Sequence, residues 1–430
     1  MLLTVVSFLN IISTSGQNPA PAKPQDKPVI IENGTLHTGT GKVIEKATIV
    51  FQKGKIIQAG ESTVISLSAD EMRNAITIDA SGKQVYPGLI ALNTNLGLSE
   101  IELVRATNDF SETGTTNASA RSCISYNTDS KVIPTVRSNG VLMAQVTPQS
   151  GLISGNSSVM QLDAWNWEDA LYKSDEGIHI NWPSMRIFKA WWASPEEEQR
   201  ERMQKNLNTL YSFFKEAKSY CESNSKDETN LQFESMRGIF NGTKKLYIHC
   251  DYVREINAAV NFCNDQKIKM VLVGGNDSWM TTDILKQNNI PVIITRTQSL
   301  PSRDDEQVYT PYMLPGLLQK AGVVYAISEG GFWQQRNLAF EAGQAVSYGI
   351  SKEDALKSIT LTPAQILEID ETTGSIETGK DASLIISDGD ILDMKTNHIT
   401  YAFIQGRQIN LDDVQKQLYR KYCDKYGLKQ

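Results

Sequence analysis

Apolar and polar positions alternate in short stretches at both ends of the chain, and turn residues separate these stretches. The apolar stretches are Val29–Ile31, Ala47–Phe51, Ile56–Ile57, Ala382–Ile386 and Ile399–Ile404. Turns fall at Asn33-Gly34, Lys53-Gly54 and Gln405-Gly406, where glycine supplies the backbone freedom of a tight turn. This pattern predicts antiparallel strands at each end. We expect them to pair as one composite β-sandwich formed by residues 29–84 and 372–412.

Between the two ends, apolar strands alternate with helical stretches. The strand candidates are Val141–Val146, Lys245–His249, Met270–Val273, Val292–Thr295 and Val323–Ser328. The clearest helix runs from Ser194 to about Tyr220. Its start predicts an N-cap at Ser194, Pro195 in the first helical position and a capping box closed by Glu197. The alternation predicts an α/β fold, most simply a (β/α)8 TIM-like barrel over residues 85–371, with a C-terminal helix over residues 413–430.

The segment from Val85 to Asn95 is predicted to be a buried strand that is entered through Pro87-Gly88. It ends in two polar side chains, Asn93 and Asn95, at positions i and i+2. Alternation along a strand points two such side chains to the same face. Barrel strands deliver paired ligands to their C-terminal mouth in this way, so both asparagines are candidate site residues.

The composition excludes some classes of protein. The hydrophobic fraction of 40% and the charged fraction of 21% are typical of an ordinary globular protein. The net charge of −7 leaves no basic excess to neutralise phosphates, so we expect no nucleic-acid partner. The five cysteines form no CxxC pair, and a zinc ribbon is therefore unsupported.

The N-terminal segment is predicted to direct export. Residues 1–17 combine an apolar core, too short to span a bilayer, with small residues, as in a signal peptide. Residues 18–28 form a Pro-rich linker. We therefore expect a periplasmic or secreted protein with no membrane span in the mature chain. The alternative is a buried or disordered N-terminal arm.

Signatures at both ends of the chain resemble the amidohydrolase superfamily, in its imidazolonepropionase-like branch. Residues 351–364 (SKEDALKSITLTPA) and 374–386 (GSIETGKDASLII) are similar to that family's C-terminal signature. Residues 33–57 and the segment VYPGLI at 85–90 are similar to its first sandwich segment and first barrel strand. The resemblance implies the barrel and the composite sandwich, and it implies hydrolysis of carbon–nitrogen bonds.

The resemblance also implies a set of metal ligands, from which this chain departs. Active members carry His-x-His on the first strand, a Lys on the fourth, His on the fifth and sixth, and Asp on the eighth. Here the first pair is Asn93 and Asn95, the sixth strand has glycines followed by Asn276, and the eighth has Glu329. His249 keeps the fifth position. Without a ligand role, His249 would be a satisfied strand-end histidine and Glu329 a helix cap.

The histidine count limits the metal site. Of four histidines, His37 and His398 fall in the sandwich segments, which leaves His179 and His249 for the barrel. A four-histidine binuclear centre is therefore impossible. We expect at most one divalent metal ion, zinc first among them, or none. Its candidate ligands are His249 and Glu329, with Asp251 or Asn276 in support.

Three other features could contribute to a pocket. Residues 147–158 are rich in Gly and Ser, resemble a family loop near the pocket, and could hold a carboxylate through backbone amides, or simply form a tight rim loop. A cluster of aromatic residues could line a pocket or a partner surface, or pack in the core; it comprises Trp165, Trp167, Trp182, Trp191 and Trp192. Lys189 is the candidate for the fourth-strand Lys.

Three functions fit these observations. The first is a hydrolase of a non-peptide or cyclic amide or a dipeptide, with His249 and Glu329 as catalytic residues and Asn93, Asn95 and Asn276 binding substrate. The second is an inactive homologue that binds a small ligand or pairs with an active relative. The third is a non-enzymatic exported binding protein. A small-molecule ligand is expected in each, and a homo-oligomer is compatible with all three.

Overall fold

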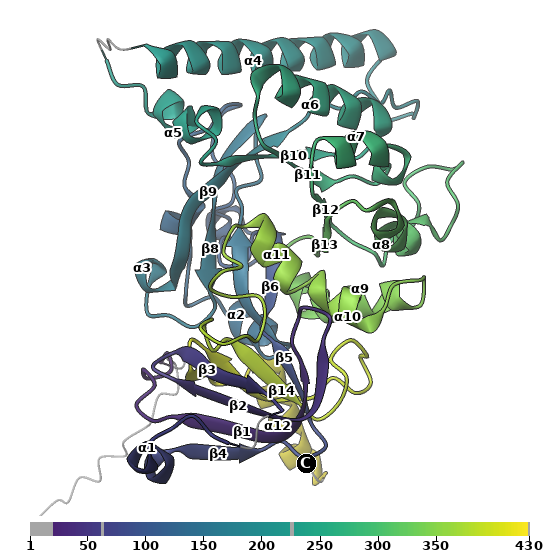
Figure 1. Cartoon of the computed structure of the whole chain (residues 1–430). Coiled ribbons are helices and arrows are strands. Elements are labelled where there is room, and N and C mark those ends of the chain that lie inside the picture. Colours follow the sequence, from purple (N-terminus) through teal and green to yellow (C-terminus); the bar gives the residue numbers. More distant parts are fainter. Residues whose placement is uncertain (1–19, 62–63, 224–227, 429–430) are drawn as a thin grey trace, which may run out of the picture.

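The computed structural model describes residues 20–61, 64–223 and 228–428. Two eight-stranded sheets form the frame of a mixed α/β fold (Figure 1). The first sheet lies at one end of the molecule, and the second sheet rises from it toward the long helix at the other end (Figure 1). The predicted signal peptide, residues 1–17, lies outside the described residues.

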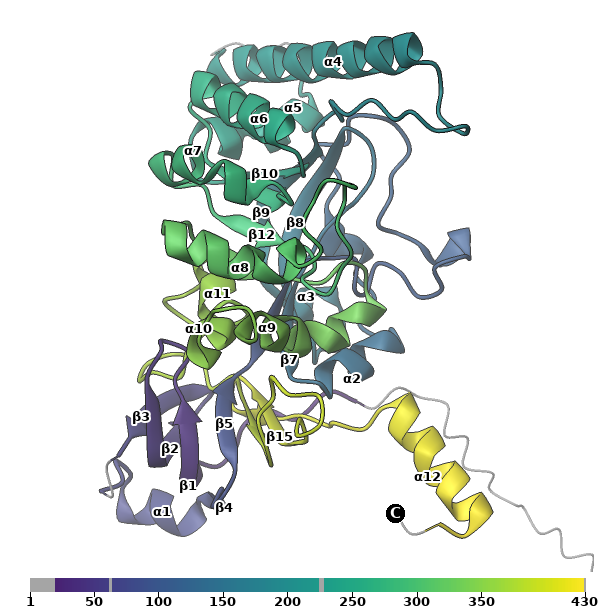
Figure 2. The ribbon, with the colours of Figure 1, turned by 90° about the vertical axis from the view of Figure 1, so that its right-hand side faces the viewer.

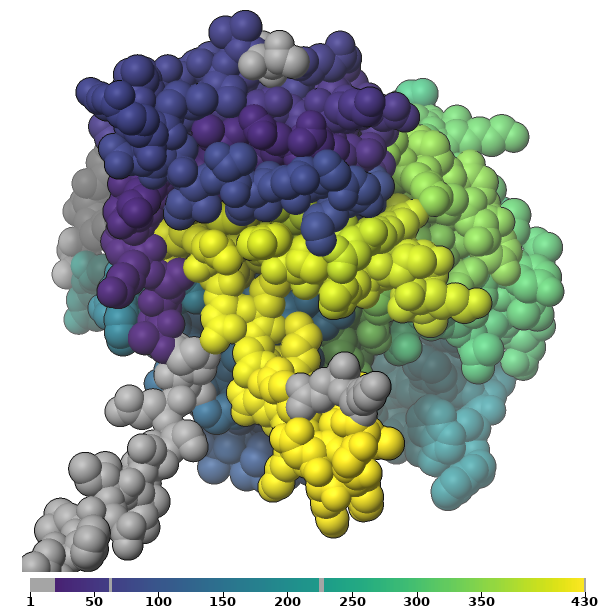
Figure 3. Space-filling model, turned by 90° about the horizontal axis from the view of Figure 1, so that it is seen from below, coloured from purple at the N-terminus to yellow at the C-terminus, as the bar shows by residue number. Residues whose placement is uncertain are grey.

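The first sheet joins the two ends of the chain. Its strands are β1 (Val29–His37), β2 (Val43–Gln52), β3 (Lys55–Gly60), β4 (Ile76–Asp79), β5 (Gln84–Pro87), β14 (Leu384–Ser387), β15 (Ile399–Ile404) and β16 (Arg407–Gln408). They run in the order β16-β15-β14-β5-β1-β2-β3, with β4 paired to β1. The antiparallel pairing of β5 with β14 brings the two ends of the chain side by side (Figure 3). These strands form one sheet, where the sequence pattern predicted a sandwich.

The second sheet is nearly closed. Its strands are β6 (Leu89–Thr94), β7 (Val141–Val146), β8 (Ile153–Gln161), β9 (Leu171–Asn181), β10 (Lys245–Cys250), β11 (Met270–Gly274), β12 (Val292–Ile294) and β13 (Tyr325–Ile327), hydrogen-bonded in chain order. The two edges approach through side chains, because Ser328 Oγ donates to Leu92 O and Thr94 Oγ1 donates to Gly331 O.

One strand departs from the predicted parallel barrel. β8 is antiparallel to both β7 and β9, whereas the other pairs of this sheet are parallel. The connections on either side of β8 are residues 147–152 and 162–170. A crossover to a parallel strand needs a dozen or more residues. These connections are too short, so β8 returns antiparallel.

The interior of the second sheet is apolar at its base. Inward residues from seven strands form one buried cluster with the helix α11 (Leu361–Ile366). Backbone bonds from Ile90 N to Ile359 O and from Ile327 N to Ser358 O hold the segment before α11 between the two edge strands. Because α11 fills the base, the polar side chains of the interior gather toward the opposite end.

Helices cover the outside of the second sheet. They are α2 (Val132–Arg137), α3 (Trp167–Ala170), α4 (Glu196–Glu222), α5 (Leu231–Phe240), α6 (Val253–Gln266), α7 (Thr282–Gln287), α8 (Thr310–Ala321), α9 (Leu338–Val346) and α10 (Lys352–Lys357). The short helix α1 (Ala69–Asn74) lies beside the first sheet (Figure 1), and α12 (Val414–Tyr426) contacts α2. Single turns of 3₁₀-helix lie at Arg105–Thr107, Ser122–Ser125, Ser278–Met280 and Trp333–Asn337. Helices α6 to α9 lie along one side of the sheet (Figure 2). Among the described residues, no helix is long and apolar enough to cross a membrane.

The start of α4 differs from the prediction. Pro195 is the N-cap, with extended backbone and no side-chain capping bond, and the helix begins at Glu196. The Ser194 hydroxyl instead accepts a hydrogen bond from Arg202. Proline has no side-chain acceptor, so the predicted capping box is wrong, and the three glutamates of the first turn face the positive end of the helix dipole.

A buried ion cluster ties the N-terminal segment and the first sheet to the second sheet. Asp163, after β8, pairs with Arg137 of α2 at 2.7 Å and with Arg407 of β16 at 3.0 Å. Asp163 Oδ2 also accepts a hydrogen bond from the backbone N of Ala22. One carboxylate therefore holds three distant segments together.

Candidate functional site

The five predicted site residues lie at the same end of the second sheet. Strands β6, β10, β11 and β13 run in one direction. Asn93 is the second-last residue of β6 and Asn95 follows the strand, while His249 is the second-last residue of β10. Asn276 and Glu329 follow β11 and β13. The carboxyl ends of these strands therefore form the rim on which a site can be built.

The two asparagines of β6 are held in an irregular strand end. Asn93 has a φ of 50°, and the pairing of β6 with β7 shifts register between Ala91 and Thr94. The regular alternation that predicted a shared face for Asn93 and Asn95 is therefore interrupted, in a left-handed conformation that asparagine tolerates. Both residues are buried, and neither side-chain oxygen has a hydrogen-bond partner. Two buried acceptors thus lack donors.

His249 is paired with the other histidine of the barrel. His249 Nε2 lies 2.9 Å from His179 Nδ1 of β9. His249 is partly exposed, whereas His179 is fully buried. Burial lowers the pKa of His249 to about 4. Burial, and then the neighbouring His249, lower the pKa of His179 well below its usual range. Both rings are therefore neutral at neutral pH.

A buried carboxyl group lies behind the two histidines. Glu176 Oε1 accepts hydrogen bonds from Ser157 Oγ and Gln145 Nε2, each at 2.5 Å, and Glu176 Oε2 accepts one from the Tyr247 hydroxyl at 2.8 Å. Burial raises the pKa of Glu176, and these three hydrogen bonds, led by that of Ser157, oppose the rise. Ser157 Oγ also lies 2.9 Å from His179 Nε2. A polar chain therefore runs from Glu176 to His249.

The same network reaches β6. Asn93 N donates to Gln145 Oε1 at 3.0 Å. A backbone N–H can only donate, so the Gln145 oxygen faces Asn93 and its amide nitrogen faces Glu176. The Tyr247 ring stacks on His179 with ring centres 4.5 Å apart. Five neighbouring strands, β6 to β10, thus contribute to one buried polar network.

Glu329, which follows β13, belongs to a second buried group together with Glu341 of α9. Glu341 Oε2 accepts hydrogen bonds from Thr297 N at 2.7 Å, Thr297 Oγ1 at 2.6 Å and Gln298 N at 2.8 Å. Burial raises the pKa of Glu329 to about 8, and the hydrogen bond and negative charge of Glu341 add to the rise. Exposed Arg296, 3.8 Å from Glu329 Oε2, acts in the opposite direction. Glu329 is therefore a proton donor at neutral pH.

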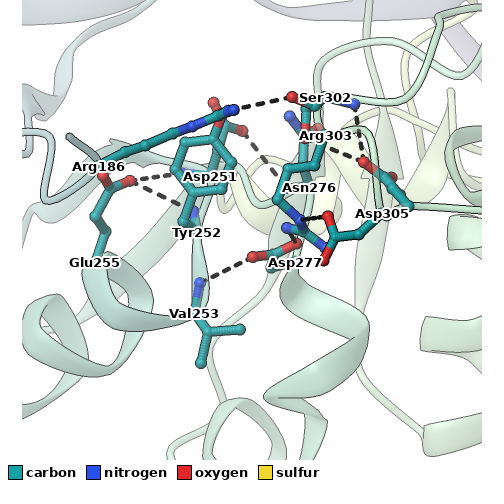
Figure 4. A network of polar contacts seen from close by, with 11 residues as sticks. Arg186, Asp251, Tyr252, Val253, Glu255, Asn276, Asp277, Ser302, Arg303 and Asp305 are labelled. Atoms are coloured by element: carbon teal, nitrogen blue, oxygen red, sulfur yellow. Dashed lines mark hydrogen bonds and ion pairs between the residues drawn. The ribbon is translucent and has the colours of Figure 1, made fainter. Parts of the chain in front are cut away.

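Asn276 lies in a network of rim loops beside β10 and β11 (Figure 4). Asn276 N donates to Asp251 Oδ1 at 3.4 Å. Asp251 is largely buried, and burial raises its pKa. Arg303 pairs with Asp277 and with Asp305 in the same network (Figure 4). These contacts connect the loops that follow β10, β11 and β12.

Arg186 closes this rim network from the segment after β9. It donates to the Tyr252 hydroxyl at 2.8 Å and to Ser302 O at 3.1 Å (Figure 4). Among the described residues, no hydrogen bond joins Glu329 or Asn276 to His249. The structure places the candidates on one rim as three separate groups.

The side chains present do not fit the metal centre that the resemblance implies. Within the described ranges, no three His, Cys, Asp or Glu side chains converge as a metal ligand set would. Both ring nitrogens of His179 have partners, and Glu329 bonds to Glu341 instead. Among the described residues, the His249 ring hydrogen-bonds only to His179, through Nε2, so its Nδ1 has no partner there. Asn93 and Asn95 add only neutral oxygens.

Three expectations from the sequence change in the structure. The Gly- and Ser-rich segment 147–158 is half strand, because β8 begins at Ile153 and pairs along its length. Lys189 lies in an exposed segment after β9, so it is no strand residue. The tryptophans separate: Trp182 is buried against Phe262, whereas Trp191 is 97% exposed.

Sequence reasoning missed the network around Glu176. Its members are Gln145, Ser157, Glu176 and Tyr247. One signal was present in β10, where Tyr247 and His249 alternate with Leu246 and Ile248 and so share a face. No such signal marks Glu176, because the left-handed residue Asp175 before it breaks the alternation of β9.

Comparison with known proteins gives a consistent result. Residues 329–411 match the Amidohydrolase family. The chain is 24% identical over 402 residues to an imidazolonepropionase from Picrophilus torridus, covering 86% of this chain and 94% of that protein.

Solved structures agree in fold. An amidohydrolase from Thermotoga maritima has a TM-score of 0.76 at 20% identity, covering 89% of this chain and 99% of that one. A Xaa-Pro dipeptidase with bound methionine has a TM-score of 0.55 at 12% identity, covering 89% of this chain and 100% of that one. The family match over residues 329–411, the sequence similarity and the shared fold support the amidohydrolase superfamily as the group of proteins that this chain resembles.

Proposed function

We propose that the chain hydrolyses the carbon–nitrogen bond of a small non-peptide or cyclic amide, or of a dipeptide, in a remodelled site poor in metal ligands. The observation that carries this proposal is the environment of His249. It is neutral, partly exposed at the rim, and held from inside the barrel by His179. The likeness in fold supports the further proposal that the second sheet is a divergent (β/α)8 barrel with its site at this rim.

In this proposal His249 and Glu329 divide the proton transfers. His249 takes a proton from water, whose oxygen then bonds to the carbonyl carbon. As the carbon–nitrogen bond breaks, the leaving nitrogen takes a proton from Glu329, which is protonated at neutral pH because its pKa is about 8. His249 can act as the base because its lowered pKa leaves it unprotonated, and Glu329 can act as the acid because its raised pKa keeps it protonated.

The asparagines would bind the substrate. Asn93 and Asn95 each present a buried oxygen without a donor, and an amide N–H of the substrate would supply one. Asn276, on the neighbouring rim loop, would contact the other end of the substrate. A substrate that carries N–H groups is favoured over one that carries only acceptors.

The shortage of metal ligands favours a second candidate function. An inactive homologue would keep the fold and bind a small ligand, or pair with an active relative that retains the His-x-His pair. The absence of a converging ligand set among the described residues is the observation that favours it. The two candidates differ in one measurable property, which is turnover.

The test is hydrolysis by the purified chain. Imidazolonepropionate, other cyclic amides and Xaa-Pro dipeptides form the substrate panel, chosen from the names of the relatives. Each is assayed with a chelator, with added zinc and with neither, and bound metal is measured by mass spectrometry. We expect turnover of at least one substrate.

Two histidine variants make the assay specific. His249→Gln should lower kcat/KM by roughly 10²–10⁴-fold, the contribution of a general base. His398→Gln is the matched control, because His398 is exposed beside the first sheet and pairs with Asp388. Equal loss in both variants, or no loss in His249→Gln, contradicts the proposed role. Absence of turnover across the panel, with a stable complex with a His-x-His relative on size exclusion, supports the second candidate.

A further inference from the structure

The residues behind His249 are joined by hydrogen bonds that all donate in one direction. The proposed function does not use this direction. It runs from Glu176 through Ser157 and His179 to His249, with distances of 2.5, 2.9 and 2.9 Å. Glu176, Ser157 and His179 are buried, so water does not compete for these bonds. Each donor hydrogen in this chain of contacts has few acceptors within reach. The donor and the acceptor of each hydrogen bond can therefore be assigned.

The direction begins at Glu176. Three side chains converge on its two oxygens, and Gln145 can only donate there because its oxygen is held by Asn93 N. The Ser157 hydroxyl has a single proton. It lies 2.5 Å from Glu176 Oε1 but 3.4 Å from the other acceptor, Gly177 O. The shorter bond to a carboxylate is the stronger, so Ser157 donates to Glu176.

The direction then passes through both histidines. Because the Ser157 proton is directed at Glu176, its oxygen can only accept from His179 Nε2, which must carry hydrogen. A neutral ring protonated at Nε2 has a bare Nδ1, so His179 Nδ1 accepts from His249 Nε2. His249 in turn carries its hydrogen on Nε2. Its remaining nitrogen, Nδ1, is unprotonated.

We propose that Glu176, Ser157 and His179 are positioning residues that fix the tautomer of His249, so that Nδ1 of His249 presents a lone pair at the rim of the barrel. Assigning that lone pair to proton abstraction rests on the proposed function, whereas the tautomer itself does not. The ligand that this nitrogen recognises is a hydrogen-bond donor, either water or a substrate N–H. The stacked Tyr247 ring, 3° from parallel, holds the plane of His179 so that both of its nitrogens stay aligned.

Nitrogen NMR on the full chain tests the tautomer directly. The chain has only four histidines, so labelling histidine with ¹⁵N gives four rings, and His37→Gln and His398→Gln identify the two outside the barrel. Protonated and bare ring nitrogens differ widely in chemical shift. We expect His179 and His249 each to show a protonated Nε2 and a bare Nδ1 at pH 7. A protonated Nδ1 on His249 overturns the proposal, because it requires the chain to run in reverse from a neutral Glu176.

Variants separate positioning from simple packing. Ser157→Ala removes the acceptor of His179 Nε2, and we expect both rings to populate the second tautomer. Ser158→Ala is the matched control, since Ser158 is equally buried on the same strand but accepts from Asp175 N instead. Identical tautomers in both variants overturn the proposal. If Ser157→Ala does not fold, Ser157→Thr, which keeps the hydroxyl, and the wild-type spectrum still decide it.

The same spectra keep this inference apart from the proposed function. No substrate is needed to observe the tautomer. Failure of every hydrolysis assay with a bare Nδ1 on His249 refutes the proposed function and leaves the positioning chain standing. Turnover with a protonated Nδ1 on His249 refutes the positioning chain and the role of His249 as base, and leaves hydrolysis itself standing.

Discussion

The proton shared by Glu329 and Glu341 makes the stability of the fold depend on pH. The Glu341 carboxylate is fixed by three donors on one oxygen, so Glu329 beside it holds the proton. Burial and Glu341 raise the pKa of Glu329 from 4.5 to about 8. Between these values the folded state binds a proton that the unfolded state has released. Stability therefore falls as the pH rises through this window, and the contribution of Glu329 is complete only below pH 4.5.

The magnitude follows from the shift. One pKa unit corresponds to about 1.4 kcal/mol, so inside the window the free energy of unfolding falls by about 1.4 kcal/mol for each pH unit. Glu329→Gln is neutral at every pH and removes this slope. Between pH 5.5 and pH 7.0 the wild type should therefore lose about 2 kcal/mol relative to Glu329→Gln. Because the two carboxyl groups share one proton, the dependence of the free energy of unfolding on pH is a property of the Glu329–Glu341 pair and not of Glu329 alone.

Equilibrium urea unfolding, followed by tryptophan fluorescence at several pH values, measures the difference. Glu201→Gln is the matched control, because it removes the same charge from an exposed position on α4. Its pH profile should run parallel to that of the wild type. A constant difference between wild type and Glu329→Gln from pH 5.5 to pH 7.0 would refute the shared proton.

Two further predictions concern packing and the joining of the two sheets. Asp163→Asn should destabilise the chain by about 3–5 kcal/mol in thermal melts, because it leaves buried Arg137 and half-buried Arg407 without their shared carboxylate. Asp175→Asn, which breaks the more exposed pair with Arg121, should cost about 1 kcal/mol or less in thermal melts. Gly343→Ala should cost about 1–3 kcal/mol, because the added Cβ meets Leu392 O, whereas Gly330→Ala meets nothing and should be neutral in urea unfolding.

The positions of several strands were predictable from local pattern. Val141–Val146 and Ile399–Ile404 are strands with the predicted bounds, because each is a short run of β-branched and apolar residues between turns. The direction of β8 was not predicted. It depends on the length of two connections, and the Gly- and Ser-rich composition of residues 147–158 had suggested a loop instead.

The candidate site, too, could be predicted from the sequence only in part. The types of residue at the strand ends, among them Asn93, Asn95 and Glu329, could be read from the chain. The geometry could not. A left-handed residue within β6 interrupts the alternation that paired the asparagines, and only the tertiary structure sets Glu341, which is in α9, beside Glu329.

By itself, the sequence determined which residues are available for chemistry. Four histidines, two of them in the barrel, limit the metal chemistry before any fold is known. The tertiary structure decided which residues meet. His179 and His249 are 70 positions apart, and Glu176 reaches them through Ser157 of the reversed strand β8. Strand pairing brings these groups together inside the barrel, and their contacts depend on register and burial, which local sequence patterns do not encode.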